Sequence, residues 1–191
     1  MSTTTTDHQI LKAALETMIE YGYAGATTKR IAKAAGVNEV TLFRKFGSKA
    51  QLVLAALQQE FERFREAGVR YTGDLEADLL RVVSVYGELV LRLGRMIPVL
   101  AAELPRRPEL RAGLEFPAQI VAAVSELLSR YQAKGALHEE PPMQATLALL
   151  APLLVRGMAA NLSLLPSLPR IEPHDYVHHF LRGRSPRGPR P

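Results

Sequence analysis

The sequence predicts an all-α protein of about nine helices, and three observations support this fold class. Apolar residues recur at spacings of three and four, which places them on one face of a helix. No segment alternates convincingly between apolar and polar residues, and the Asn-Gly and Asp-Gly pairs typical of β-hairpins do not occur. The 13 Pro and 13 Gly stand mostly between the periodic segments, where they end helices.

Four helices are expected in the N-terminal third of the chain. The first carries an apolar stripe that includes Leu11 and Leu15, with Asp7 as its N-cap and Gly22 as its stop. The second and third are short, and each begins at a Thr or Asn residue of the kind that caps helices. Ser48 caps a longer fourth helix. The expected ranges are 8–21, 27–35, 38–45 and 48–68.

The remaining helices are mostly longer and more apolar. Proline and glycine residues separate them, and the expected ranges are 74–93, 94–104, 116–134, 141–165 and 173–181. The composition changes near Gly47, because the helices before it are polar and basic. We therefore expect two domains, residues 1–47 and 48–181, followed by a disordered basic tail at residues 182–191.

Composition narrows the function classes. With 191 residues, of which 47% are hydrophobic, the chain is long enough to bury a core in one or two small domains. The absence of Cys excludes a disulfide scaffold, a zinc ribbon, an iron–sulfur site and a thiol nucleophile. The N-terminal residues lack the pattern of a signal peptide, and Pro152, Arg156 and Asn161 interrupt the most apolar stretch. We expect a soluble cytoplasmic protein that does not cross a membrane.

The positive charge is concentrated in two places. The whole chain has a net charge of +5. Residues 27–49 alone hold six Lys or Arg residues against one acid, and the tail after Leu181 holds four Arg residues and no acid. A localised basic patch is the electrostatic signature of a protein that binds a polyanion. A solvated helix face is the alternative explanation.

Residues 27–46, TTKRIAKAAGVNEVTLFRKF, have the spacing of a helix-turn-helix. Ala32 is the small residue required where the two helices cross. Gly36 permits the left-handed conformation of the turn. Val37 and Leu42 follow it at the spacings that pack the second helix on the first. In this arrangement the second helix presents its N-terminal residues to a DNA major groove.

The segment from about Ile10 to Leu52 resembles the DNA-binding domain of the TetR family of transcriptional regulators. An apolar first helix leads into YGYAGATTKRIAKAAGVNEVTLFRKFGSKAQL, in the family's order. The aromatic end of the recognition helix, followed by Gly47-Ser48-Lys49, is the most specific part. The resemblance covers about a quarter of the chain, so no residue roles are carried over beyond it.

The resemblance implies a set of DNA contacts. They are Thr27, Thr28, Lys29, Asn38, Glu39, Val40, Thr41, Phe43, Lys45 and Lys49. The family usually has a Tyr in place of Phe43, and Phe can only pack against sugar or core because it has no hydroxyl group. A groove-facing Glu39 can accept a hydrogen bond from cytosine. Alternatively, it stabilises the start of its own helix.

Nothing in the sequence indicates catalysis. No nucleophile elbow, phosphate loop or dinucleotide fingerprint is present. His174 and His178 have the spacing of metal ligands on a helix, but no convincing third ligand lies nearby in the sequence, so polar surface positions explain them better. We therefore expect a protein that is not an enzyme, with no cofactor and no metal site.

The apolar C-terminal helices predict a dimer interface and a ligand pocket. Residues 146–155 are apolar on nearly all sides, and a second subunit explains a second buried face. A monomeric core is the alternative. The predicted interface residues are Leu147, Leu150, Leu154, Gly157, Tyr176 and Phe180. A mixture of large apolar and isolated polar residues is typical of a small-molecule pocket, although each can also be core. The predicted pocket residues are Phe64, Tyr86, Met96, Phe116, Gln119, Met158 and Asn161.

The sequence thus predicts a ligand-responsive transcriptional regulator, most simply a repressor. Its partners would be a palindromic double-stranded DNA operator, a second copy of the chain and an apolar or amphipathic small molecule. Two alternatives stay open. One is a DNA-binding protein of the same fold without a small-molecule effector, and the other is a helical small-molecule binding protein whose basic segment is incidental.

Overall fold

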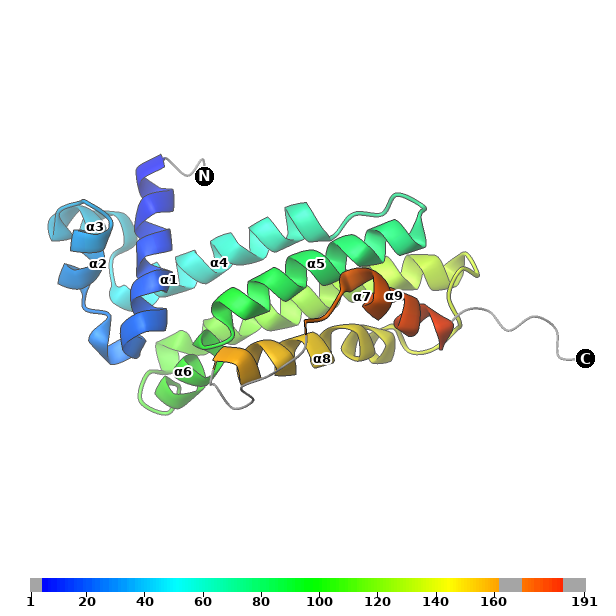
Figure 1. The fold of residues 1–191 in the computed structure, drawn as a ribbon. Coiled ribbons are helices and arrows are strands. Elements are labelled where there is room, and N and C mark those ends of the chain that lie inside the picture. Colours follow the sequence, from blue (N-terminus) through cyan, green and yellow to red (C-terminus); the bar gives the residue numbers. More distant parts are fainter. Residues whose placement is uncertain (1–4, 162–169, 184–191) are drawn as a thin grey trace, which may run out of the picture. The chain divides into compact units, whose positions relative to one another are not determined.

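The computed structural model describes residues 5–161 and 170–183, and within these ranges it contains nine α-helices, one 3-10 helix and no strand (Figure 1). The all-α prediction is confirmed. The elements are α1 (Thr5–Gly25), α2 (Thr28–Ala34), α3 (Glu39–Phe46), α4 (Lys49–Gly68), α5 (Leu75–Leu93), α6 (Met96–Glu103), the 3-10 helix η1 (Pro108–Leu114), α7 (Glu115–Ala133), α8 (Pro142–Asn161) and α9 (Pro173–Arg182). Most of the predicted basic tail lies outside the described residues.

The start of α1 differs from the sequence prediction. This helix begins at Thr5, so Asp7 lies in its first turn rather than at its N-cap. The predicted stop, Gly22, interrupts the helical geometry with a φ of 69°, but helical turns continue to Gly25. The 3-10 helix η1 was not predicted, because its residues follow a proline-rich break with no clear apolar period.

The chain divides into two compact units. The first contains the residues up to Phe61 together with Arg95–Phe116, and the second contains Glu62–Gly94 and the chain from Pro117 onward. The first unit therefore extends beyond the predicted boundary at residue 47. It includes more than half of α4 and also α6 and η1.

The core of the first unit forms beneath the short helices. The stripe on α1 includes Ile10, Ala14 and Met18, none of which is exposed to solvent. Helix α1 contacts both α2 and α6, and α2 contacts α3. On the two short helices the deeply buried residues are Ile31 and Leu42. Each short helix is too short to be stable alone, so this shared burial holds α2 and α3 in place.

The second unit is built around α5, which packs against α8 and α9. At the crossing of α5 and α8 the backbones approach closely, since a Cβ atom on Gly157 would lie 2.8 Å from the carbonyl oxygen of Val90. The side-chain amide of Asn161 donates to the carbonyl oxygens of Leu91 and Gly157, both at 2.8 Å. These contacts fix the end of α8 against α5.

A buried carboxylate joins the start of α5 to α7. Asp78 is fully buried and accepts hydrogen bonds from the backbone and hydroxyl of Thr72 (2.7 and 2.8 Å), from Arg81 (2.8 Å) and from the Tyr131 hydroxyl (2.5 Å). Burial alone would raise the pKa of Asp78, but these hydrogen bonds outweigh it and leave the pKa below its ordinary value. Burial and the carboxylate raise the pKa of Tyr131 to about 12.

Helix α8 is, among the described helices, the one long and apolar enough to cross a membrane by length and composition. The position of α8 in the fold explains its apolar composition without a membrane. One face is buried through Leu149, Leu150 and Leu153. On the other face, Leu147 is 49% and Val155 64% exposed. We interpret α8 as a core helix with a second apolar face available to a partner.

Candidate nucleic-acid interface

The turn between α2 and α3 has the conformation that the sequence predicts. Gly36 adopts a φ of 66°, in the left-handed region. The amide of Gly36 donates to Lys33 (3.2 Å), and the amide of Val37 donates to Ala32 (3.0 Å). These two bonds form a Schellman motif, which ends α2. Within the described residues, no atom lies within 4 Å of where a Cβ on Gly36 would be, so backbone conformation is what requires the glycine.

Side-chain caps define the starts of both short helices. The hydroxyl of Thr27 accepts a hydrogen bond from the amide of Arg30 (3.2 Å), and the side-chain oxygen of Asn38 accepts one from the amide of Val40 (2.9 Å). Both caps satisfy amide groups that the helix itself leaves unpaired. Asn38 is therefore a structural residue of α3 as well as a predicted DNA contact.

Glu39 is engaged inside the motif. Its carboxylate accepts a short hydrogen bond from the Thr28 hydroxyl on α2. Two residues predicted to contact DNA are thus joined to each other. This geometry supports a structural role for Glu39, because its carboxylate links the first turn of α3 to α2.

The outer face of α3 carries two exposed apolar side chains. Leu42 is fully buried and fixes the helix, whereas Val40 is 71% and Phe43 46% exposed. The exposed Arg44 stands four residues after Val40, on the same side of the helix. Apolar side chains beside a cation suit a major groove, where they contact thymine methyl groups and sugars while the cation meets phosphate. The motif match carried no role for Arg44, although its spacing from Val40 indicated a shared face.

Two lysines predicted to contact DNA, one near the end of α3 and one at the start of α4, have partners within the protein. Lys45 forms an ion pair with Asp7 of α1, with Nζ and Oδ1 2.6 Å apart. Lys49 donates to the carbonyl of Tyr23 and lies 4.1 Å from the centre of its ring. Burial and the nearby charge of Arg107 lower the pKa of Lys49. To contact DNA as predicted, Lys45 and Lys49 would therefore each have to exchange a protein partner for DNA.

The other cations of residues 27–49 differ in whether they have a partner within the protein. Arg30 donates to the carbonyl of Gly25 (2.5 Å) and stacks 4.0 Å from the centre of the Tyr21 ring. Lys29 and Lys33 are exposed on α2. The predicted contacts Thr27 and Lys29 are exposed, whereas Thr41 is partly exposed. Three of the six cations, Arg30, Lys45 and Lys49, thus have partners within the protein.

The predicted ligand residues belong to both units. Phe64 and Tyr86 pack edge to face in the second unit, with ring centres 5.9 Å apart. Burial raises the pKa of Tyr86 to about 12. Met96 is buried in the first unit, and Phe116 is partly exposed there. Asn161 uses its amide to hold α8 against α5. Two partly exposed members complete the set, Gln119 and Met158.

The predicted dimer residues also divide into two groups. Leu150, Gly157 and Phe180 are buried within the protomer, and Gly157 makes its close crossing with α5 of the same chain. The hydroxyl of Tyr176 donates to the carbonyl of Leu149 (2.8 Å). Leu147 is exposed, and Leu154 and Tyr176 are partly exposed. A groove along α8 is lined by Leu147, Ala148, Ala151, Pro152, Val155, Arg156 and Ala159.

Comparisons with known proteins agree with this geometry. The model of the bacterial regulatory proteins of the TetR family matches residues 10–56. AcnR of Corynebacterium efficiens, an HTH-type transcriptional repressor, is 30% identical over 139 residues, 71% of each chain. YvkB of Bacillus subtilis, an uncharacterized HTH-type transcriptional regulator, is 40% identical over 77 residues, which span 40% of this chain but only 41% of YvkB.

Solved structures extend the likeness to the whole fold. The flavonoid-responsive regulator FrrA aligns with a TM-score of 0.66 and 25% identity over 96% of this chain and 98% of its own. A putative TetR-family transcriptional regulator from Rhodococcus sp. aligns with a TM-score of 0.72 and 21% identity, covering 94% and 97% of the two chains. The second likeness concerns the fold alone.

A helix-turn-helix with exposed basic and apolar side chains, attached to an all-α second unit, defines a DNA-binding transcriptional regulator. The chain belongs to the TetR family of transcriptional regulators. This membership confirms the predicted family and implies operator DNA as a partner. Because the family is not enzymatic, the prediction that the protein is not an enzyme is also confirmed.

Proposed function

We propose that this protein is a cytoplasmic repressor that binds a palindromic operator as a homodimer and leaves it when a small molecule binds the second unit. The outer face of α3 is the observation that carries the DNA-binding part. Val40 and Phe43 are exposed there beside Arg44, while Leu42 anchors the helix from the opposite side. A single DNA-binding unit of this size gains sequence specificity when two copies bind two half-sites.

The uncovered face of α8 supports the homodimer. Its exposed large residues are Met143, Leu147 and Val155, and the small residues between them leave a shallow groove. A contiguous apolar face on a soluble protein is a site of association. A second copy of the same face would be self-complementary, as a two-fold interface requires. In this proposal Leu147 and Leu154 contact the partner, and Leu150 and Phe180 support the face from within.

Two relatives support the remaining parts of the proposal. AcnR is described as a repressor, and FrrA as a flavonoid-responsive regulator. We infer that this chain also represses transcription and responds to an apolar or amphipathic molecule. The buried pair of Phe64 and Tyr86 offers aromatic surface for such a ligand in the second unit. The operator-bound form would have the pocket empty.

Selection from a pool of random DNA duplexes tests the proposed function. We expect the purified protein to enrich a palindrome with half-site centres about 34 Å apart, one helical turn, and to bind it as two protomers per duplex. Leu147→Asp, on the exposed face of α8, should give a monomer and lower operator affinity without altering the basic segment. Enrichment of no sequence at moderate salt would refute the DNA-reading role, and an intact dimer of Leu147→Asp would refute the interface.

A reporter strain tests repression, and a compound screen then tests the effector-free alternative. Deleting the gene should raise transcription from a promoter that carries the selected palindrome. A library of small molecules is screened for compounds that dissociate the complex in vitro. Any such compound must bind the operator complex more weakly than the uncomplexed protein, by the factor by which it lowers operator affinity. Equal affinities in the two states would support the effector-free alternative.

A further inference from the structure

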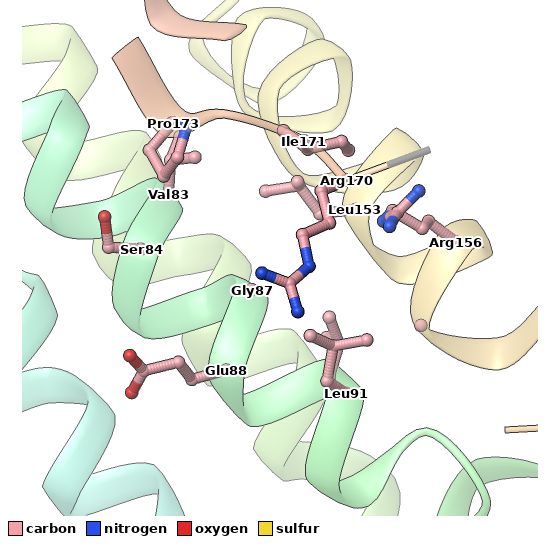
Figure 2. A pocket seen from close by; sticks show the side chains of 12 residues that line it. Val83, Ser84, Gly87, Glu88, Leu91, Leu153, Arg156, Arg170, Ile171 and Pro173 are labelled. Atoms are coloured by element: carbon pink, nitrogen blue, oxygen red, sulfur yellow. The ribbon is translucent and has the colours of Figure 1, made fainter. Parts of the chain in front are cut away.

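The second unit contains a cavity that does not involve the predicted ligand residues. It has a volume of about 430 Å³ and lies between α5, α8 and the residues that lead into α9 (Figure 2). Its lining includes Val83 and Gly87 of α5, Leu153 and Arg156 of α8, and Arg170. None of the seven predicted pocket residues lines it. The volume is within the range of small-molecule sites, about 300–1,000 Å³.

The floor of the cavity is a glycine without a packing role. Gly87 lies inside α5, where glycine destabilises a helix relative to alanine. A Cβ atom built on Gly87 meets no atom within 4 Å, so nothing in the described residues excludes a side chain there. Gly157, which also lines the cavity, differs because its Cβ would collide with Val90. Gly87 thus preserves open space rather than permitting a helix crossing.

The walls combine apolar surface with two cations. Val83 and Leu153 are buried and present aliphatic groups to the cavity. Arg156 extends from α8 and Arg170 from the segment just before α9, and both line the cavity (Figure 2). Within the described residues, neither guanidinium forms an ion pair or hydrogen bond. Glu88 contributes one carboxylate at the rim, so the two cations exceed the local negative charge.

We propose that this cavity binds an amphipathic organic anion, in a site separate from the predicted pocket. The apolar body of the ligand lies over Gly87, between Val83 and Leu153. Its carboxylate or other anionic group pairs with Arg156 and Arg170, because guanidinium groups bind such oxyanions through paired hydrogen bonds. The proposal does not require that the ligand change DNA affinity, so it stands independently of the proposed effector response.

Calorimetric titration with decanoate below its micelle concentration tests this site. Decanoate has a ten-carbon apolar chain and one carboxylate, and decyltrimethylammonium provides the same chain with the opposite charge. We expect one decanoate per protomer and at least about tenfold weaker binding of the cation. The double variant Arg156→Gln/Arg170→Gln should lose about tenfold or more in decanoate affinity. Arg130→Gln, which removes a cation of α7 outside this cavity, is the matched control and should retain full affinity.

A second pair of variants tests the cavity itself. Gly87→Phe should fill the space and abolish decanoate binding, whereas Gly87→Ala should remain folded and keep most of it. Circular dichroism confirms folding, and if Gly87→Phe does not fold, the arginine variants decide. Equal decanoate affinity in the wild type and the double arginine variant, or equal binding of both probes, would overturn the proposal. So would a wild-type dimer that binds no decanoate and dissociates more readily with both arginines replaced, since the cavity would then belong to the contact between copies.

Discussion

Two helix pairs in this molecule depend on glycine for different reasons. Between α2 and α3, Gly36 has a left-handed φ and open space around its Cβ position, so only its backbone conformation matters. Between α5 and α8, Gly157 is in a helix, but its Cβ position is occupied by the backbone of Val90. The first requirement is local in sequence, whereas the second depends on a residue in a distant helix. This difference decides which parts of the fold the sequence could reveal.

Forcing α5 and α8 apart should have the largest effect on stability. Gly157→Leu places a large side chain against the backbone of α5, which cannot move as a side chain can. We expect a loss of more than about 3 kcal/mol in the free energy of unfolding, measured by urea titration with circular dichroism. Gly87→Ala on the facing helix is the control, and it should raise stability by about 0.5–1 kcal/mol through helix propensity. A stable Gly157→Leu variant would show that the close crossing does not hold the unit together.

The buried carboxylate near the start of α5 gives the next largest effect. Asp78→Ala leaves Tyr131 and Thr72 without their acceptor, and we expect a loss of about 2–3 kcal/mol at pH 7. Because the folded-state pKa of Asp78 is lowered, its contribution is present above the unfolded-state pKa of about 3.9. That contribution is lost as the pH falls through the lowered folded-state pKa.

Urea titrations across pH measure this dependence. The stability difference between the wild type and Asp78→Ala should be constant near neutral pH and shrink below about pH 4. The exposed Asp175→Ala is the control and should show little effect at any pH. A difference that stayed unchanged well below pH 4 would mean that ionised Asp78 does not stabilise the folded state.

Substitution of Gly36 should have a smaller effect on stability. Gly36→Ala meets no steric neighbour but must adopt a left-handed φ, so we expect a loss of about 1 kcal/mol. Gly36→Asn should lose less, because asparagine tolerates this conformation better. Thermal unfolding of both variants measures the difference. If the two variants were equally destabilised, the assignment of Gly36 to backbone conformation alone would be wrong.

Releasing a cation of the reading unit should have the smallest effect. Lys45 is paired with Asp7, so Asp7→Asn should make it available to phosphate and raise operator affinity a few fold. Lys45→Ala should weaken binding similarly on every sequence and reduce the slope of log affinity against log salt by about one. Glu16→Gln removes a different acid of α1, paired with Lys12, and is the control for general charge. Equal effects of Asp7→Asn and Glu16→Gln would show that the Asp7 pair does not restrain Lys45.

The sequence predicted the parts of the site that depend on local geometry. Thr27 and Asn38 are the N-caps of α2 and α3, Gly36 forms the turn, and Leu42 is buried, as the motif required. The two caps and the turn each involve residues fewer than ten positions apart. The long helices could be predicted from the sequence equally well, because the apolar period of each is a local property.

Contacts between distant segments could not be inferred in the same way. The pairing of Lys45 with Asp7 and of Lys49 with Tyr23 joins different helices, and no spacing rule indicates it. Gly157 was predicted at the interface with a partner, but the pattern could not show that α5 of the same chain packs against it. Apolar residues on α8 likewise suit a core, a pocket or an interface equally well.

The central claim is that α3 reads DNA bases, and one comparison of selected sequences tests it directly. Val40 is 71% exposed, so Val40→Ala removes its two methyl groups without disturbing the core. Duplex selection with this variant should change base preference at the same symmetric step of both half-sites and lower affinity for the wild-type operator about tenfold, with an unchanged salt slope. Val121→Ala, the same substitution on α7, should select the wild-type operator. If Val40→Ala selected that operator too, with wild-type affinity, α3 would not be the reading helix.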